Sequence, residues 1–332
     1  MIVRTKGIEM TGTTRRSLLG GMAVLGASAA IPVAAQAAHV DETIPLWPSA
    51  PPGAPKSLPE RKVTERSSDP LFHDRWITGI AKPSLSVRRP AYPNGAAMLL
   101  VPGGGYGFLA WDNEGEEQAR WLTARGVTCF ILSYRLPGEG WANRSLVPLQ
   151  DAQRAIRLIR ARADEFEVDP KRVAVLGFSA GGHLAGSLAT RFAETVYTPT
   201  DEADRQSARP DLAGLIYPVV SLVESYTHEG SRDSLLGPGS GEDQRRHGSV
   251  ETRVTADTPP IFLVHASDDG TVPIANSLAL YQAMLAAKCP GELHAFDKGG
   301  HGFGVRLPKD VPASAWPGLL YAYGTERGVF RA

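Results

Sequence analysis

Short apolar runs alternate with amphipathic segments through most of the chain. Runs of apolar and β-branched residues predict strands at residues 84–90, 96–102, 127–136, 172–178, 212–220, 259–266 and 292–296. Helical periodicity predicts helices at residues 114–126, 148–169 and 274–287, and a further helix that begins at about Ala180. Continuous apolar strands separated by helices are typical of a parallel sheet covered on both faces. The pattern therefore predicts an α/β fold with a mostly parallel central sheet.

Two segments break this alternation. Residues 43–70 are rich in Pro, Ser and charge, so we expect residues 38–74 to form an irregular arm ahead of a domain at residues 75–332. Residues 221–256 are polar and contain "GPGSG" and "EDQRRHGS". They indicate an excursion over the top of the sheet, which is either a lid that binds substrate or a surface insertion.

The N-terminus has the composition of an export signal. Arg15 and Arg16 precede a weakly apolar segment rich in Gly and Ala, and Ala35-Gln36-Ala37 provides a small-x-small cleavage site. We expect residues 1–37 to be a twin-arginine signal peptide, which implies a periplasmic or secreted protein. A membrane anchor is the alternative, but the many Gly and Ala residues disfavour a stable span, and no stable anchor is expected.

Charge and cysteine content narrow the range of partners. Of the 332 residues, 35 are Lys or Arg and 35 are Asp or Glu, so the formal net charge is zero. A nucleic-acid partner would need a basic surface and is not expected. The two cysteines, Cys129 and Cys289, and the histidines lack the spacing of zinc ligands. We therefore expect neither a metal nor a cofactor.

The stretch "GFSAG" matches the G-x-S-x-G pattern and lies between a predicted strand and a predicted helix. This context is the one that a nucleophile elbow requires, with Ser179 as the nucleophile. A glycine-rich turn without chemistry is the alternative for the pentapeptide alone. A serine hydroxyl is a weak nucleophile at neutral pH, so the hypothesis needs a base.

His301 is the histidine best placed to act as that base. It lies in "KGGHGFG", directly after the last predicted strand, where the triad histidine follows when the chain order is Ser, acid, His. His183 is one helical turn beyond Ser179, and we interpret it as a packing or capping residue.

The acid is expected after the penultimate strand, where "HASDDGTVP" offers Asp268 and Asp269. Only one of these carboxylates can accept a hydrogen bond from the imidazole, and we expect the other to cap the turn.

An acyl transfer also requires donors to the developing oxyanion. The glycines of "VPGGGYG" follow an early strand and permit unusual backbone conformations. We expect the N–H of Gly104 or Gly105 to form the oxyanion hole together with the N–H of Ala180. A phosphate-binding loop is disfavoured because no Lys-Ser/Thr pair follows.

With these motifs, the sequence resembles an α/β-hydrolase of the esterase and lipase class. It is most similar to the bacterial carbohydrate-esterase branch, which includes acetylxylan and feruloyl esterases and whose members often carry xylanase- or pectin-acetylesterase-like names. The family pattern H-G-x-x-D-x-x-V-P places the acid on Asp269, although Ala266 replaces its glycine. Pro102 stands where lipase-like relatives have a histidine, which fits the carbohydrate-esterase branch. The motifs that carry the resemblance are "VPGGGY", "EGEEQARWL", "SYRLP", "DAQRAIRLIR", "GFSAGGHLA", "HASDDGTVP" and "KGGHGFG".

The resemblance implies a serine carboxylic-ester hydrolase that removes short acyl groups, acetyl first, from a sugar or polysaccharide through an acyl-enzyme. Tyr106 and Trp111 are either an aromatic surface for a sugar ring or packing residues. A serine peptidase of the prolyl-oligopeptidase type is one alternative, but too few residues precede the first strand for a propeller domain. A non-catalytic binding module is another, although no triad residue is missing.

The export hypothesis predicts the start of the mature chain. N-terminal sequencing of the protein purified from its native host should find a first residue near Ala38. A mature chain that begins upstream of Ala38 would reject cleavage at this site.

Overall fold

The structure is a computed structural model that describes residues 42–331. An eight-stranded sheet has the strand order β1-β4-β7-β5-β8-β9-β10-β11. Neighbouring strands from β7 to β11 run parallel, whereas β1 and β4 are antiparallel at one edge. The mostly parallel sheet predicted from the sequence is confirmed. The strands of this sheet are β1 (Glu42–Pro45), β4 (Ser84–Arg88), β5 (Ala97–Val101), β7 (Thr128–Ser133), β8 (Val173–Phe178), β9 (Leu212–Ile216), β10 (Ile261–Ala266) and β11 (Gly291–Phe296).

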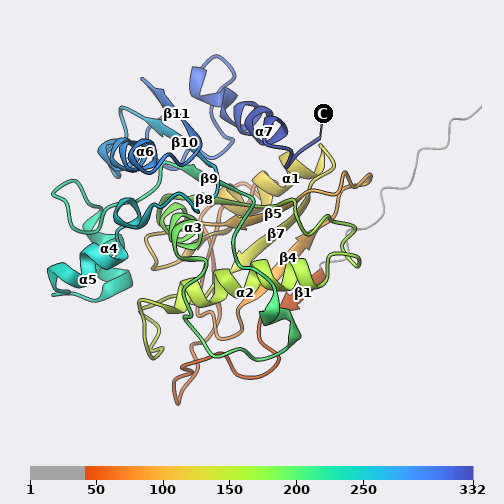
Figure 1. Ribbon diagram of the computed structural model, residues 1–332, viewed down its shortest axis with the longest axis vertical. Helices are drawn as coiled ribbons and strands as arrows, with labels where there is room; N and C mark the ends of the chain where they lie inside the picture. The colour runs from red at the N-terminus through yellow and green to blue at the C-terminus, as the bar shows by residue number, and fades with distance from the viewer. Residues whose placement is uncertain (1–41, 332) are drawn as a thin grey trace, which may run out of the picture. The chain divides into compact units, whose positions relative to one another are not determined.

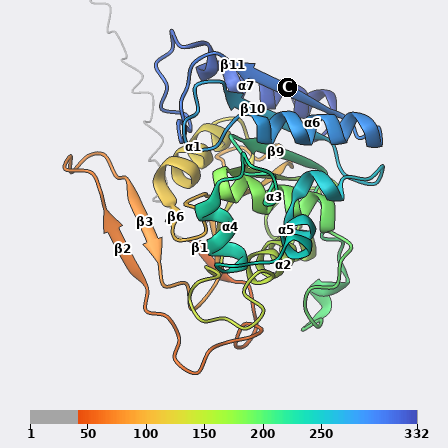
Figure 2. The ribbon, with the colours of Figure 1, turned by 90° about the vertical axis from the view of Figure 1, so that its left-hand side faces the viewer.

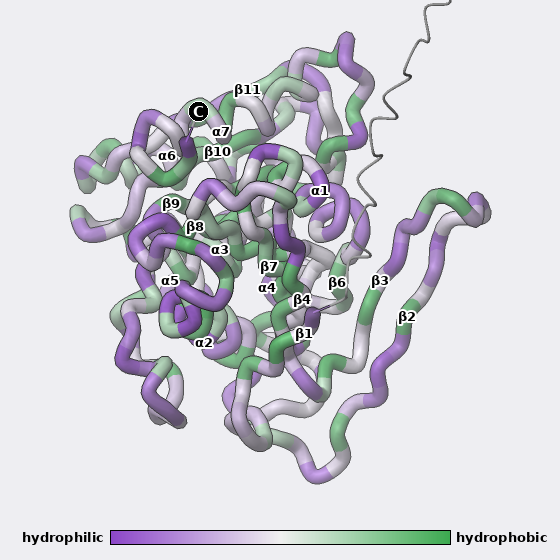
Figure 3. Tube along the Cα trace, turned by 90° about the vertical axis from the view of Figure 1, so that its right-hand side faces the viewer, coloured by the Kyte–Doolittle hydropathy of each residue, from purple (hydrophilic) through white to green (hydrophobic). Residues whose placement is uncertain are grey.

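Helices cover both faces of the sheet (Figure 1). On one face α1 and α7 lie together, and the rings of Trp121 and Tyr321 meet edge to face with centroids 6.2 Å apart. On the other face α2, α3 and α6 pack over the central strands, which are almost entirely apolar in Figure 3. The helices of these layers are α1 (Glu117–Thr123), α2 (Val147–Ala161), α3 (Ser179–Arg191), α6 (Ala275–Ala287) and α7 (Trp316–Glu326).

Residues 221–256 fold as a small helical cap. The cap contains α4 (Glu229–Leu236), α5 (Glu242–Gly248) and a 3₁₀ turn at Val250–Arg253. Figure 2 shows the cap helices in front of α3. Nε2 of His183 on α3 donates a hydrogen bond of 2.8 Å to the carbonyl of Gly248, which fastens the cap to the core.

The expectation of an irregular arm at residues 38–74 is wrong for two short stretches. β1 pairs antiparallel with β4 at the edge of the main sheet. β2 (Lys62–Glu65) pairs with β3 (Arg75–Thr78), which pairs with β6 (Leu109–Ala110), and the β2–β3 hairpin stands out in Figure 2 and Figure 3. These strands are too short and, in β2, too exposed to show an apolar alternation. β1 forms because β4, a strand further along the chain, supplies its hydrogen-bond partners, whereas β2 forms as one arm of a hairpin with β3.

Several predicted elements end earlier than their apolar pattern does. The helix predicted at 148–169 ends at Ala161, and the strand predicted at 212–220 ends at Ile216. There Tyr217 has a left-handed φ of 38°, and Pro218 has no N–H to donate to a ladder. The helix predicted at 114–126 begins with a π turn at Asp112–Glu116, a feature often found at functional sites. The apolar pattern does not predict α7, since Pro and Gly interrupt it.

The expected signal peptide, residues 1–37, lies outside the described residues. Among residues 42–331, no helix is long and apolar enough to cross a membrane.

Candidate active site

Ser179 follows β8, a central strand of the sheet, and begins α3. Its backbone has a left-handed φ of 51°, a conformation that side-chain-bearing residues rarely adopt. The flanking glycines are required by close packing. A Cβ on Gly181 would lie 2.2 Å from the Val101 carbonyl oxygen, and one on Gly177 would lie 2.2 Å from the Gly181 carbonyl oxygen. The G-x-S-x-G spacing is therefore set by the space around the turn.

The structure brings Ser179, His301 and Asp269 into one hydrogen-bonded chain. Nδ1 of His301 lies 2.7 Å from Oδ2 of Asp269, and Nε2 lies 2.9 Å from Oγ of Ser179. Because an ionised carboxylate only accepts hydrogen bonds, Nδ1 carries the imidazole proton. The lone pair of Nε2 is then available to accept the proton of the Ser179 hydroxyl. This is the geometry of an activated serine nucleophile.

Asp269 is the carboxylate that contacts His301, and its surroundings keep it ionised. Burial alone would raise the pKa of Asp269. Hydrogen bonds from His265 and His301, the His301 charge and the N–H of Val272 outweigh this effect and hold the pKa well below its usual range. Oδ1 also accepts the N–H groups of Thr271 and Val272, each at 2.9 Å.

Asp268 has a different function from the turn cap expected of it. Its Oδ1 accepts the N–H groups of Gly299 and Gly300 at 2.9 and 2.8 Å, both in the loop that carries His301. The two adjacent carboxylates therefore have different partners: Asp269 accepts a hydrogen bond from the imidazole of His301, and Asp268 fixes the backbone of the loop that carries His301.

His265, at the end of β10, is a second imidazole on Asp269. Its Nε2–H donates to the Val272 carbonyl at 2.9 Å and lies 3.3 Å from Oδ2 of Asp269. Nδ1 then accepts from the hydroxyl of Ser277 at 2.7 Å. The fully buried His265 ring therefore holds together the two ends of the loop from Asp269 to Val272.

The loop after β5 supplies candidate donors for an oxyanion. The N–H of Gly103 is already bonded to Oε2 of Glu114 at 2.7 Å. Gly104 and Gly105 have φ values of 120° and 62°, and within residues 42–331 their N–H groups donate to no protein acceptor. Ala180 lies in the first turn of α3, where an N–H has no intrahelical acceptor. These free donors are the groups that an oxyanion hole needs.

A buried pair, Glu114 and Tyr217, connects this loop to the His301 loop. The Tyr217 hydroxyl donates to Oε1 of Glu114 at 3.0 Å and accepts the N–H of Gly304 at 3.1 Å. Burial raises the pKa of Glu114, although its bonds to Gly103 and Tyr217 oppose that effect. Nδ2 of Asn113 also donates to the carbonyl of Gly302, the residue that follows His301, at 2.7 Å.

Comparison with known proteins places the chain in a family. The sequence model of the family described as BD-FAE matches residues 90–284. The chain belongs to the BD-FAE family. The chain is also 33% identical to the solved acetyl ester-xyloside bifunctional hydrolase from Caldicellulosiruptor lactoaceticus, with a TM-score of 0.70, over 88% of this chain and 98% of that one. The fold is that of the α/β-hydrolases, as the sequence predicts.

Two curated relatives share a shorter part of their length with this BD-FAE chain. It is 36% identical to endo-1,4-beta-xylanase B of Butyrivibrio fibrisolvens over 68% of this chain and 35% of that protein. It is 33% identical to acetylxylan esterase of Xylanibacter ruminicola over 65% of this chain and 42% of that protein. The chain thus spans between a third and a half of the length of these two relatives.

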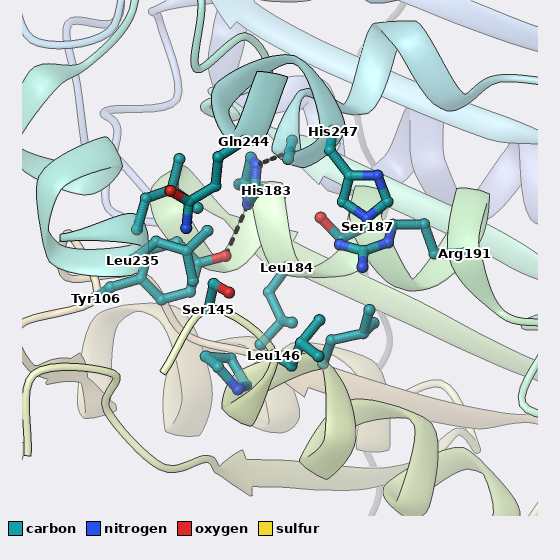
Figure 4. Close-up of a pocket in the computed structure, with 14 residues that line it drawn as sticks. Tyr106, Ser145, Leu146, His183, Leu184, Ser187, Arg191, Leu235, Gln244 and His247 are labelled. Atoms are coloured by element: carbon teal, nitrogen blue, oxygen red, sulfur yellow. Dashed lines mark hydrogen bonds between the residues drawn. The ribbon is translucent and has the colours of Figure 1, made fainter. Parts of the chain in front are cut away.

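Tyr106 and Trp111 are buried packing residues, which removes them as a surface for a sugar ring. The Tyr106 hydroxyl bonds Nδ1 of His183 at 2.8 Å beside a cavity of about 40 Å³ between α3 and the cap (Figure 4). A groove of about 1060 Å³ beside the β2–β3 hairpin is larger. Neither space is lined by Ser179, Asp269 or His301.

Cys129 and Cys289 are free and buried, and burial raises the pKa of the Cys129 thiol above its usual range. Within residues 42–331, no group of three His, Cys, Asp or Glu side chains is arranged to hold a metal ion.

Sequence reasoning missed the residues that hold the site together, namely Glu114, Tyr217 and Asn113. Tyr217 could have been found from its position, because it follows the carboxyl end of a parallel strand, where functional side chains gather. Glu114 and Asn113 had no such signal, since they lie in a polar run that resembles an ordinary helix start.

The buried imidazole of His183 predicts a pH-dependent loss of stability. Burial lowers its pKa to about 4, against about 6.5 in an unfolded chain. Between these values the unfolded chain binds a proton that the folded chain does not, so stability falls as the pH falls from about 6.5 to about 4. When the pH is lowered from 7.5 to 5, the free energy of unfolding, measured with urea, should fall by about 2 kcal/mol more for the unchanged protein than for His183→Gln. Equal losses would reject a neutral His183.

Proposed function

We propose that this protein is a serine carboxylic-ester hydrolase that removes short acyl groups, acetyl first, from a sugar or polysaccharide. The observation that carries the proposal is the hydrogen-bonded chain from Ser179 through His301 to Asp269, at the carboxyl edge of the sheet. It is accompanied by free N–H groups in the glycine loop after β5 and in the first turn of α3, which a glycine-rich structural turn would not require.

The proposed reaction begins when Oγ of Ser179 attacks the ester carbonyl carbon while Nε2 of His301 takes the hydroxyl proton. In the proposed mechanism, Asp269 stabilises the imidazolium that forms, and the N–H groups of Ala180 and of Gly104 or Gly105 receive the oxyanion. Collapse of the tetrahedral intermediate breaks the bond to the alcohol, and His301 returns the proton to the departing oxygen. Water, activated by His301 in the same way, then releases the acid and regenerates Ser179.

Two relatives support an acetylated carbohydrate as the substrate class. One similar protein is an acetylxylan esterase and another is an acetyl ester-xyloside hydrolase. The Ser179 residue is 8% exposed and the His301 side chain 18% exposed, so both remain reachable from solvent. Zero net charge is compatible with an uncharged sugar ester.

Replacing Ser179 tests the proposal. Ser179→Ala should lower kcat/KM for acetate release from acetylated xylan and from 4-nitrophenyl acetate by at least about 10⁴-fold, because the nucleophile is removed. Chromatography of the released acid measures the effect. Ser187→Ala, the same change further along α3, is the matched control and should retain activity.

Two results would contradict different parts of this proposal. Undiminished hydrolysis of both esters by Ser179→Ala would reject the nucleophile. If the unchanged protein releases feruloyl or methyl groups but no acetate from a panel of esterified polysaccharides, the serine esterase stands and the acetyl specificity is rejected.

The two neighbouring aspartates should respond differently to substitution. Asp269→Asn replaces the carboxylate by an uncharged amide whose one oxygen is held by the Thr271 and Val272 N–H groups, so the amide nitrogen faces His301, and kcat for 4-nitrophenyl acetate should fall by about 10³–10⁴-fold. Asp268→Ala loosens the His301 loop without touching the imidazole, and a fall of about tenfold is expected. Steady-state assays of both variants with 4-nitrophenyl acetate compare the two values of kcat directly. Equal losses would mean that Asp269 has no special role.

A further inference from the structure

A short segment of the cap passes from the acid side of the site to the oxyanion loop. At one end, the Tyr226 carbonyl accepts a 3.1 Å hydrogen bond from Nδ2 of Asn276, on the α6 helix that follows the acid loop. At the other end, Oγ of Ser231 lies 4.0 Å from the position of a Cβ on Gly105. Residues 226–231 therefore bridge the two sides of the catalytic serine and histidine, and His228 lies within this bridge.

The hydrogen bonds of His228 fix its tautomer. The N–H of Ser231 donates to Nδ1 of His228 at 3.2 Å, and Oγ of Ser231 lies 2.8 Å from the same nitrogen. A nitrogen that accepts from a backbone N–H has a free lone pair, so the ring proton is on Nε2. Within residues 42–331, this Nε2–H donates to no acceptor, and the ring is half-buried.

Two charged groups of the site act on the imidazole of His228. Burial and then the charge of His301 lower the pKa of His228, while Asp269 opposes them. The ring is thus within electrostatic reach of both triad partners of Ser179, and it remains a neutral donor near pH 7. Gly230 also lies beside the ring: a Cβ at that position would lie 3.3 Å from Cε1 of His228, so a side chain there would crowd the imidazole.

His228 and Ser231 do not form a second nucleophilic pair. Ser231 is fully buried, which keeps its hydroxyl from a substrate carbonyl. No carboxylate of the described residues bonds the Nε2 side of His228, so nothing there would stabilise an imidazolium. The Nε2–H of His228 is therefore a donor that is open to a ligand.

We propose that the Nε2–H of His228 donates a hydrogen bond to an oxygen of the sugar that leaves when its ester is cleaved. The proposal rests on the proposed esterase function, in which His301 protonates the departing oxygen and so places the leaving group on the His301 side of Ser179. A sugar ring carries hydroxyl and ring oxygens next to the ester, whereas an apolar alcohol has none. A donor at this position favours sugar esters over apolar esters, because an unmet polar group is costly in a partly desolvated site.

The experiment compares two esters of the same ring size. Methyl β-xylopyranoside monoacetate offers oxygen acceptors beside the ester, and cyclohexyl acetate offers none. His228→Asn keeps an oxygen that can accept the Ser231 N–H and cap α4, but its short amide does not reach the position of Nε2. The ratio of kcat/KM for the xyloside ester over cyclohexyl acetate should fall about tenfold, chiefly through KM of the xyloside ester. His247→Ala, in the cap but directed toward Glu194, should leave the ratio unchanged.

The outcomes separate this inference from the esterase proposal. His228→Ala, which removes the whole ring, should lower the ratio to a similar extent as His228→Asn. An unchanged ratio in both variants overturns the inference, and an equal loss on both esters assigns His228 a structural role instead. Failure of the unchanged protein to hydrolyse either ester through Ser179 would reject the esterase, whatever the His228 variants do.

Discussion

The left-handed backbone of Ser179 is the constraint on which the site depends. An L-residue at a φ of 51° is strained, so the surrounding structure must hold it there. The Ser179 carbonyl accepts the N–H of Val219 at 3.1 Å, and the backbone of Gly181 packs directly on the end of β5. This turn lifts Oγ to the carboxyl edge of the sheet, where loops from β10 and β11 bring Asp269 and His301. The strain is offset by the helix and strand that meet at this position.

Two carboxylates near this turn are placed in opposite environments. Asp269 receives backbone N–H groups and two imidazoles, so its charge is stabilised and the pKa is low. Glu114 is enclosed in the core with one backbone donor and one phenol, so burial dominates and the pKa is raised. Glu114 bonds the oxyanion loop and Tyr217 bonds both Glu114 and the His301 loop. The buried pair of Glu114 and Tyr217 thus fixes the position of the oxyanion loop relative to the loop that carries His301. The hydrogen bonds of Asp269 fix His301 but do not reach the oxyanion loop.

The sequence predicted those parts of the site that depend on local order along the chain. Ser179 and His301 were predictable because a strand, a glycine turn and a loop position each have a local pattern. Asp269 needed the family spacing, since nothing local distinguishes it from Asp268. Glu114 was not predictable because its neighbours in the run are also acidic, and the π turn that directs its side chain inward follows from packing. A related reason applies to β1, whose pairing partner β4 lies far away in sequence, and to β2, whose residues are all exposed and show no apolar alternation.

The cap is fixed to the glycine loop that carries the proposed oxyanion donors. His183 bonds Tyr106, which directly follows Gly105, and also bonds Gly248 at the end of α5. The start of α4 reaches Gly105 from the other side through Ser231. A change of cap position must therefore move the glycine loop or break the His183 bonds. In the proposed mechanism, a substrate that displaces the cap would also disturb its own oxyanion donors, so the space beneath the cap limits which leaving groups allow a productive geometry.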